Sequence, residues 1–280
     1  MCKKRCRQRY LSFFPYQGGK HYLLPYILKV IPEHEIYVEP FGGSAKVLLN
    51  KPPSKIEVYN DIDKKIANLF YVVAFHFDEF QWKVNSLILS RALFDEFKKH
   101  IRNNPPKQLG DVDHAVKTYY LLLTSYAANP KFNSFMITYT KRTISFRSNI
   151  ARLFIIHQRI KNVIFESRDF RKILETYGSK KDAFIYADPP YFGKENTYDV
   201  DFTEDDHKDL LNFLKETKVK WLLSGYPNEL YDEMLKGFYR VEICVKKYSK
   251  PVNKILKEKS RPDVIEVLWA NYNINKMLEK

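Results

Sequence analysis

The residues with the clearest capacity for chemistry are Asp188-Pro189-Pro190-Tyr191, which follow the apolar run at residues 183–187. Two consecutive prolines fix φ twice and supply no amide donor, so they end a strand and form a stiff turn. The Asp188 carboxylate and the Pro189 carbonyl can then accept the two hydrogens of one amine and direct its lone pair at an electrophile. Tyr191 offers a ring on which a planar base can stack. The alternative is an ordinary strand-ending turn with a surface tyrosine.

A second constellation occupies residues 38–45, where Gly42 and Gly43 follow a short apolar run. Glycines at such a position let the backbone approach a ligand closely, and we expect a helix to follow whose first amides are free. Any tight turn after a strand would carry the same signal, and dinucleotide sites share this logic. The glycine turn therefore indicates a ligand site only in combination with other motifs.

Two polar segments could complete such a site. Asp61 and Asp63 follow the next apolar run, and an acidic residue about 20 residues after a glycine turn is the usual partner of ribose hydroxyls. We assign Asp61 to a ribose and Asp63 to capping the helix that starts at Lys64, although capping could explain both. Near the N-terminus, Lys20 could neutralise a carboxylate on a cofactor, but alone its segment is a loop.

Short β-branched and apolar runs alternate with helical patterns in most of the chain. The strands are expected at residues 36–38, 56–59, 163–165, 183–186, 221–223, 241–245 and 264–268. The first five look like buried parallel strands with their active ends at their C-termini, and the last two could form an antiparallel edge pair. Helices are expected at residues 63–75, 203–215 and 228–236. This alternation predicts an α/β sheet with helices on both faces.

Residues 76–162 break the alternation, because they read as mostly helical, with helices at residues 90–101, 111–127 and 148–161. The simplest account is an α/β domain made of residues 1–75 and 163–280, with a helical insertion at 76–162. Basic residues concentrate in a stretch that covers most of this insertion and the first residues after it. Residues 98–172 contain fifteen Lys or Arg and four Asp or Glu, a net charge of +11. Residues 240–261 carry +6, and the whole chain +14. This clustering favours a polyanionic partner over a generally Lys-rich solvated surface.

Other features bound the class of protein. The chain has three cysteines without paired zinc spacing, so a reducing, cytoplasmic setting is expected and no metal is implied. No apolar run approaches the roughly 18 residues of a membrane helix, so no membrane partner is expected. No cysteine lies near the Asp188 strand, which argues against a thiolate nucleophile at this position.

These motifs together resemble Dam-type DNA adenine methyltransferases in order and spacing. The match includes Tyr16-Gln17-Gly18-Gly19-Lys20, residues 38–43, residues 60–61 and residues 188–191, and extends to residues 165–170, 202–207 and 222–224. It implies a Rossmann-like S-adenosylmethionine methyltransferase sheet with an inserted, mostly helical target-recognition domain. It also implies methyl transfer from S-adenosylmethionine to the exocyclic amine of adenine in a specific double-stranded DNA sequence, with base flipping.

The resemblance assigns roles by position. It makes Asp188, Pro189, Pro190 and Tyr191 catalytic. The residues that it places at the cofactor are Tyr16, Lys20, Glu39, Pro40, Phe41, Gly42, Gly43, Asp61, Asp169, Phe170 and Asp188. Asp169 and Phe170 should lie beside the cofactor's adenine ring. The candidates for DNA contacts are Lys141, Arg142, Arg147, Arg152, Lys246 and Lys247, each of which could instead be solvated surface.

One position departs from the family pattern: members often have Phe-x-Gly-x-Gly in the glycine turn, and Ala45 replaces the last glycine of that pattern. We expect a small side chain there to suffice for close helix packing. The partners implied are double-stranded DNA and S-adenosylmethionine, with a cognate restriction endonuclease as a further candidate. Three alternatives stay open: methylation of the cytosine amine, methylation of an RNA base, and a DNA-binding protein without catalytic activity.

Overall fold

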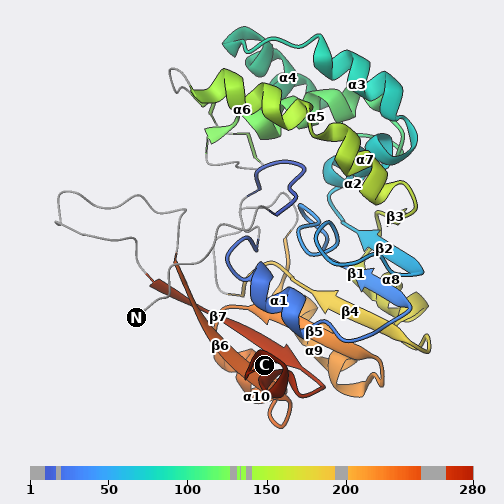
Figure 1. The fold of residues 1–280 in the computed structure, drawn as a ribbon, viewed down its shortest axis with the longest axis vertical. Helices are drawn as coiled ribbons and strands as arrows, with labels where there is room; N and C mark the ends of the chain where they lie inside the picture. The colour runs from blue at the N-terminus through green and yellow to red at the C-terminus, as the bar shows by residue number, and fades with distance from the viewer. Residues whose placement is uncertain are drawn as a thin grey trace, which may run out of the picture.

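The fold is built on one seven-stranded sheet, shown in the computed structural model in Figure 1. The structure describes residues 10–16, 20–126, 131–132, 134–136, 141–192, 201–246 and 263–279. The strand order is β3-β2-β1-β4-β5-β7-β6. The strands are β1 (Ile36–Glu39), β2 (Ile56–Asn60), β3 (Ile164–Glu166), β4 (Ala183–Ala187), β5 (Lys220–Gly225), β6 (Tyr239–Lys246) and β7 (Asp263–Ala270). All seven expected strands are therefore confirmed.

The first five strands run parallel, and β7 pairs antiparallel with both β5 and β6. The expected antiparallel edge pair is confirmed. Because parallel strands end on the same side, the segments after β1, β2 and β4 meet at one edge of the sheet. These are the segments that carry Gly42, Asp61 and Asp188.

Helices cover both faces of the sheet. On one face Val38 and Ile185 pack against α8 (Phe170–Tyr177), α9 (Glu204–Glu216) and α10 (Glu229–Met234). On the other, Tyr37 and Tyr186 belong to the core that includes α1 (Leu24–Val30), α2 (Lys64–Phe75) and α11 (Ile274–Glu279). Neighbouring residues of a strand point to opposite faces, which explains why these strands have apolar residues on both faces.

Five further helices come between α2 and β3 in sequence. They are α3 (Phe77–Asn85), α4 (Arg91–Asn103), α5 (Val112–Thr124), α6 (Lys141–Ile150) and α7 (Leu153–Ile160). Helices α3 to α6 gather at one end of the molecule, while α2 and α7 join them to the sheet (Figure 1). Their apolar residues are continuous with the core on the α2 face of the sheet, where Phe70 and Tyr119 both contact Phe13. Thus the helical segment is packed onto the α/β part rather than tethered to it.

Several helix boundaries differ from the expectation. The single helix expected at residues 148–161 is wrong, because α6 and α7 are separated by a turn at Ala151 and Arg152. Helix α5 ends at Thr124, where Ser125 forms an isolated bridge with Phe135. Helices α1, α3, α8 and α11 were not predicted; three of them span only six to eight residues and offer few periods of the helical pattern.

Side-chain caps begin three of these helices, and the cap predicted at Asp63 is among them. The Asp63 carboxylate accepts a hydrogen bond from the Lys65 amide at 2.9 Å and begins α2. Thr203 begins α9 in a reciprocal capping box with Asp206. Asn228 begins α10, and Gly237, with φ of +97°, lies three residues beyond its end.

No helix among the described residues is long and apolar enough to cross a membrane.

Candidate active site

A pocket of about 1050 Å³, open on one side, lies at the carboxyl edge of β1, β2 and β4. Clefts that combine apolar side chains with a few polar groups are typical sites for small molecules and cofactors. All eleven residues predicted at the cofactor line it: Tyr16, Lys20, Glu39, Pro40, Phe41, Gly42, Gly43, Asp61, Asp169, Phe170 and Asp188. Gln17, Gly18 and Gly19 lie outside the described residues. The sheet topology thus brings segments more than 170 residues apart to one place.

Two features explain the glycines of this turn: the Tyr59 ring lies close to Gly42, and Gly43 has a left-handed backbone conformation. A Cβ atom at Gly42 would lie 2.1 Å from the ring of Tyr59, and Gly43 has φ of +49°. Ala45 also lies in the left-handed region, with φ of +51°. The helix expected after this turn is wrong: residues 46–50 form turns, closed in part by the Leu49 amide on the Ala45 carbonyl at 2.9 Å. Backbone conformation, and not helix packing, is therefore what a glycine would satisfy at position 45.

Asp61 holds the glycine turn in place. Its carboxylate accepts hydrogen bonds from the Gly43 amide at 2.7 Å and the Asp63 amide at 2.8 Å. Burial, and then the charge of Asp63, raise the pKa of Asp61 to about 7. Each carboxylate oxygen has a second lone pair, so Asp61 can still accept hydrogen bonds from a ligand in the pocket. The capping role predicted for Asp63 is confirmed.

Glu39 is a buried carboxyl group in the wall of the same pocket. Its Oε2 atom accepts hydrogen bonds from the Tyr37 hydroxyl at 2.9 Å and from the Leu48 amide at 3.3 Å. Burial raises the pKa of Glu39 to about 8, although these hydrogen bonds oppose the shift. A carboxyl group in this setting is poised to gain charge when a cation enters the pocket.

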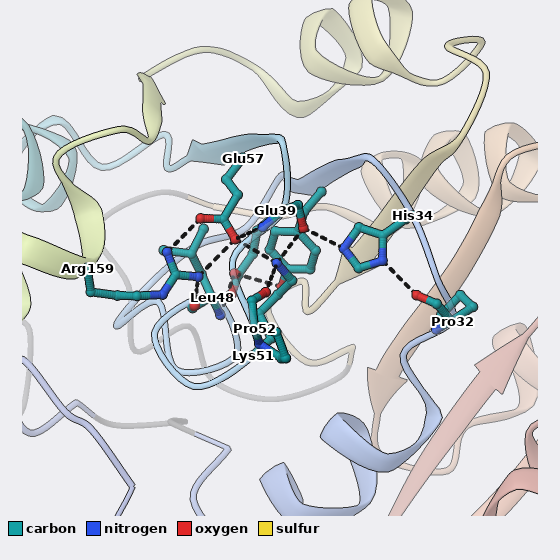
Figure 2. A network of polar contacts seen from close by, with 10 residues as sticks. Pro32, His34, Glu39, Leu48, Lys51, Pro52, Glu57 and Arg159 are labelled. Carbon is teal, nitrogen blue, oxygen red and sulfur yellow. Dashed lines mark hydrogen bonds and ion pairs between the residues drawn. The ribbon is translucent and has the colours of Figure 1, made fainter.

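Behind Glu39 lies a buried ionic network, drawn in Figure 2. Arg159 of α7 reaches Glu57 of β2 through two hydrogen bonds of 2.6 and 2.8 Å. Lys51 binds the same carboxylate at 2.6 Å and lies over the Tyr37 ring at 4.5 Å. Arg159 also donates to the Leu48 carbonyl. Helix α7 is thereby fixed to β2 and to Leu48, next to the wall of the pocket. These contacts were not predicted from the sequence.

Aromatic rings form the opposite wall. The Phe41 ring lies 5.3 Å from Phe170 and 5.5 Å from Phe202, and Phe170 lies 5.5 Å from Phe202. Asp169 caps α8 through the Arg171 amide at 2.9 Å and pairs with the Arg171 side chain, which also covers the Phe170 ring. Such a wall can hold a flat, apolar ring system. Phe202 belongs to a matched segment but was given no role, since nothing local indicates that it reaches this pocket.

Residues 188–191 follow directly on the end of β4. The Lys20 ammonium contacts Asp188 Oδ1 at 2.7 Å, donates to the Tyr191 hydroxyl and lies 4.0 Å from Glu266. Burial lowers the pKa of Lys20, but these anionic neighbours, Asp188 first, raise it well above its ordinary value. Lys20 lines the pocket, as expected of a residue at the cofactor, yet its ionic partner here is Asp188. Sequence spacing could not reveal a contact across so many residues.

The far side of this turn forms a smaller hollow. Its lining includes Pro189, Tyr191, Ser224 and Tyr226. Pro189 lines only this hollow, whereas Pro190 lines both. The rings of Tyr191 and Tyr226 have centroids 4.2 Å apart, at an angle of 48°. Residues 188–191 therefore separate the large pocket from a second space that has aromatic walls.

The predicted DNA contacts lie mainly in the helical segment. Arg152 is exposed, and Arg147 is exposed but donates to the Asn85 and Leu87 carbonyls at 3.1 and 3.0 Å. Arg147 therefore has at least a structural role. Lys141 and Arg142 begin α6 and Lys246 ends β6, but the structure does not describe their side chains. Lys247 lies outside the described residues.

Comparison with known proteins identifies the family. The model of the D12 class N6 adenine-specific DNA methyltransferases matches residues 16–249. The chain is 26% identical over 254 residues to the type II methyltransferase M.CviBI of Paramecium bursaria Chlorella virus NC1A, covering 84% of this chain and 91% of that protein. It is 24% identical to the type II methyltransferase M1.LlaDCHI of Lactococcus lactis subsp. cremoris, covering 93% and 95%.

The DNA adenine methylase of Escherichia coli K12 is 25% identical, over 64% of each chain. The mixed sheet in the order given above is consistent with a Rossmann-like methyltransferase fold. The family match selects adenine in DNA over the cytosine, RNA and non-catalytic alternatives. The chain belongs to the D12 class N6 adenine-specific DNA methyltransferase family and is an enzyme that methylates adenine in DNA.

Proposed function

We propose that the methyl donor is S-adenosylmethionine and that it binds in the large pocket. The observation that carries this proposal is the composition of the pocket. It combines an aromatic wall at Phe41 and Phe170, a glycine turn backed by Asp61, and the buried carboxyl group of Glu39. A nucleoside that carries a cationic amino-acid chain needs these three environments in this order.

Each environment suits one part of the donor. Phe41, Phe170 and Phe202 would enclose the adenine ring. Asp61 would accept from the ribose hydroxyls. Glu39 would face the ammonium group, whose positive charge would lower the pKa of Glu39 from about 8 and favour its ionised form. The pocket continues to Asp188 at the end of β4.

We propose that residues 188–191 hold the target adenine. When bound, S-adenosylmethionine supplies an electrophilic methyl group on a sulfonium centre. The Asp188 carboxylate and the Pro189 carbonyl would accept the two hydrogens of the adenine amine and direct its lone pair toward that centre. Tyr191 would stack on the base. Because the target base is paired within a duplex, it must first be flipped out into this space.

We further propose that residues 76–162 recognise the target sequence. This segment contains much of the positive charge of the chain, and Arg152 presents an exposed guanidinium near the junction of α6 and α7. Lys141, Arg142, Arg147, Lys246 and Lys247 are the other candidates for contacts with phosphates of double-stranded DNA. A restriction endonuclease with the same recognition sequence is the further partner that we propose.

The Asp61→Asn variant tests the cofactor site. The carboxylate is expected to bind the ribose more strongly than an amide does, so affinity for S-adenosylmethionine should fall about tenfold, as measured by calorimetric titration. Asp182→Asn is the matched control: Asp182 is exposed, lies at the opposite end of β4, and has φ of +62°, which asparagine tolerates. Equal affinity in all three proteins would place the ribose elsewhere.

A further inference from the structure

The two oxygens of Asp188 have unequal environments. Oδ1 receives the Lys20 ammonium at 2.7 Å and the Ser224 hydroxyl at 3.0 Å. In the part of the chain that the structure describes, no hydrogen bond or ion pair is formed by Oδ2. The side chain of Asp188 is 20% exposed. One oxygen is therefore held by the protein, and the other is available to a ligand.

Ser224 is placed for this contact by the sheet. It lies in β5, which pairs with β4 in the register Tyr186 to Leu222 and Ala187 to Leu223, so that Ser224 lies beside Asp188. Its side chain is fully buried. A second hydroxyl, that of Tyr186, lies 2.9 Å from Ser224 Oγ. The two hydroxyls thus lie side by side next to the Asp188 carboxylate, and Tyr186 also lines the large pocket.

The direction of these hydrogen bonds follows from the groups involved. An ionised carboxylate only accepts, so Ser224 must donate its single hydrogen to Asp188. The Tyr186 hydroxyl must then donate to Ser224. The result is a directed chain from Tyr186 through Ser224 to Asp188 Oδ1, and it fixes the rotation of the carboxylate about its Cβ–Cγ bond.

We propose that Ser224, oriented by Tyr186, is a positioning residue that holds Asp188 Oδ1 so that Oδ2 faces the adenine amine. This inference rests on the proposed role of Asp188 as the acceptor of that amine. Ser224 acts through Asp188, because its hydroxyl is engaged by Asp188 Oδ1 and by the Tyr186 hydroxyl. Its contribution is to keep the acceptor in the orientation required for in-line attack, a geometry on which the rate depends steeply.

The first test compares single-turnover methyl transfer by the wild-type enzyme, Ser224→Ala, Tyr186→Phe and the double variant. Ser224→Ala should transfer about 10- to 100-fold more slowly, with affinities for S-adenosylmethionine and DNA within about twofold of wild type. Tyr186→Phe should be slowed less. Because Tyr186 acts through Ser224, the double variant should be no slower than Ser224→Ala alone.

The pH profile supplies a readout that loss of packing would not change. Burial raises the pKa of Asp188, whereas Lys20 and the Ser224 hydrogen bond lower it. Removing the Ser224 hydroxyl should therefore move the acidic limb of the rate to higher pH. The other charged or titratable groups around Asp188 stay in place in this variant: Lys20, Glu39, Tyr186, Tyr191, Tyr226, Tyr231 and Glu266.

Tyr272→Phe is the matched control, since its hydroxyl donates to the Val30 carbonyl at 2.9 Å, away from the pocket. It should keep the wild-type rate and pH profile. If Asp188→Asn is inactive while Ser224→Ala keeps the wild-type rate and profile, the positioning role is overturned and the role of Asp188 stands. If Asp188→Asn is fully active, both fall. Should Ser224→Ala fail to fold, a wild-type rate and profile in Tyr186→Phe, which keeps its ring, would overturn the proposal.

Discussion

Glu39 and Asp61 show how single residues prepare the pocket for a polar ligand. Both carboxyl groups are buried, and both accept hydrogen bonds from backbone amides or a hydroxyl. Burial raises the pKa of Glu39 to about 8 and that of Asp61 to about 7. In the protein without ligand, Glu39 is therefore mostly protonated at neutral pH, and binding of a cation should release a proton.

The raised pKa of Glu39 predicts a specific pH dependence of stability. The folded state keeps the proton between about pH 4.5 and 8 while the unfolded state loses it, so the free energy of unfolding falls as pH rises through this window. In Glu39→Gln, the amide oxygen can accept both hydrogen bonds that Oε2 now accepts. The variant should have a shallower decline and be more stable than wild type at pH 9 by on the order of 3 kcal/mol.

Urea unfolding at a series of pH values, without ligand, measures this effect. Asp61 remains in both proteins and contributes the same slope to each, so the difference between them isolates Glu39. Parallel curves for the two proteins would mean that Glu39 is already ionised in the folded state.

For single residues, the sequence predicts which side chains lie at strand ends in the site, but it does not predict which other side chains they contact. Asp188, Gly42 and Asp61 follow apolar runs, which places them at strand ends. The contact of Lys20 with Asp188 joins positions 168 residues apart, and that of Ser224 depends on the register between β4 and β5. Local patterns contain neither fact.

Among the helices and strands, the strands of the sheet could be predicted from the sequence, whereas the start of α7 could not. The strands were predictable because buried parallel strands are mostly apolar on both faces and form short apolar runs in the sequence. The break between α6 and α7 was not, because the helical pattern continues across Ala151 and Arg152 without a glycine or proline. Helix α7 then carries Arg159 into the core, where it meets Glu57 and Lys51 (Figure 2).

This ionic network should contribute strongly to stability. Arg159→Ala would leave Glu57 with the Lys51 ammonium and the Ser54 amide, and the Leu48 carbonyl without this donor. Removing one partner from a buried ion pair costs about 3 kcal/mol. Because the Leu48 amide also holds Glu39, affinity for S-adenosylmethionine should fall as well.

Urea unfolding and cofactor titration of Arg159→Ala, beside Arg102→Ala, measure both effects. Arg102 is exposed on α4, and its removal should change stability by less than about 0.5 kcal/mol. Equal stability of the two variants would contradict a structural role for the network.

At the scale of the whole molecule, one edge of the sheet gathers the chemistry while the helical segment extends beyond it (Figure 1). The fold class, the parallel sheet and the antiparallel edge pair could be predicted, because they follow from alternating periodicities. The sharing of one core between the helical segment and the sheet could not, since apolar residues such as Phe70 and Tyr119 do not reveal their neighbours. A shared core gives the two parts a fixed relation, so a recognised sequence could be presented to Asp188 without a large rearrangement.

The most direct test of the account is transfer of labelled methyl groups from S-adenosylmethionine to unmethylated double-stranded DNA, followed by nucleoside analysis, for wild type and Asp188→Ala. Asp182→Asn controls for the loss of a carboxylate elsewhere. We predict label only in N6-methyldeoxyadenosine with wild type and the control, and at least about 10³-fold less with Asp188→Ala. Label in methylcytosine, or equal transfer by Asp188→Ala, would contradict the account.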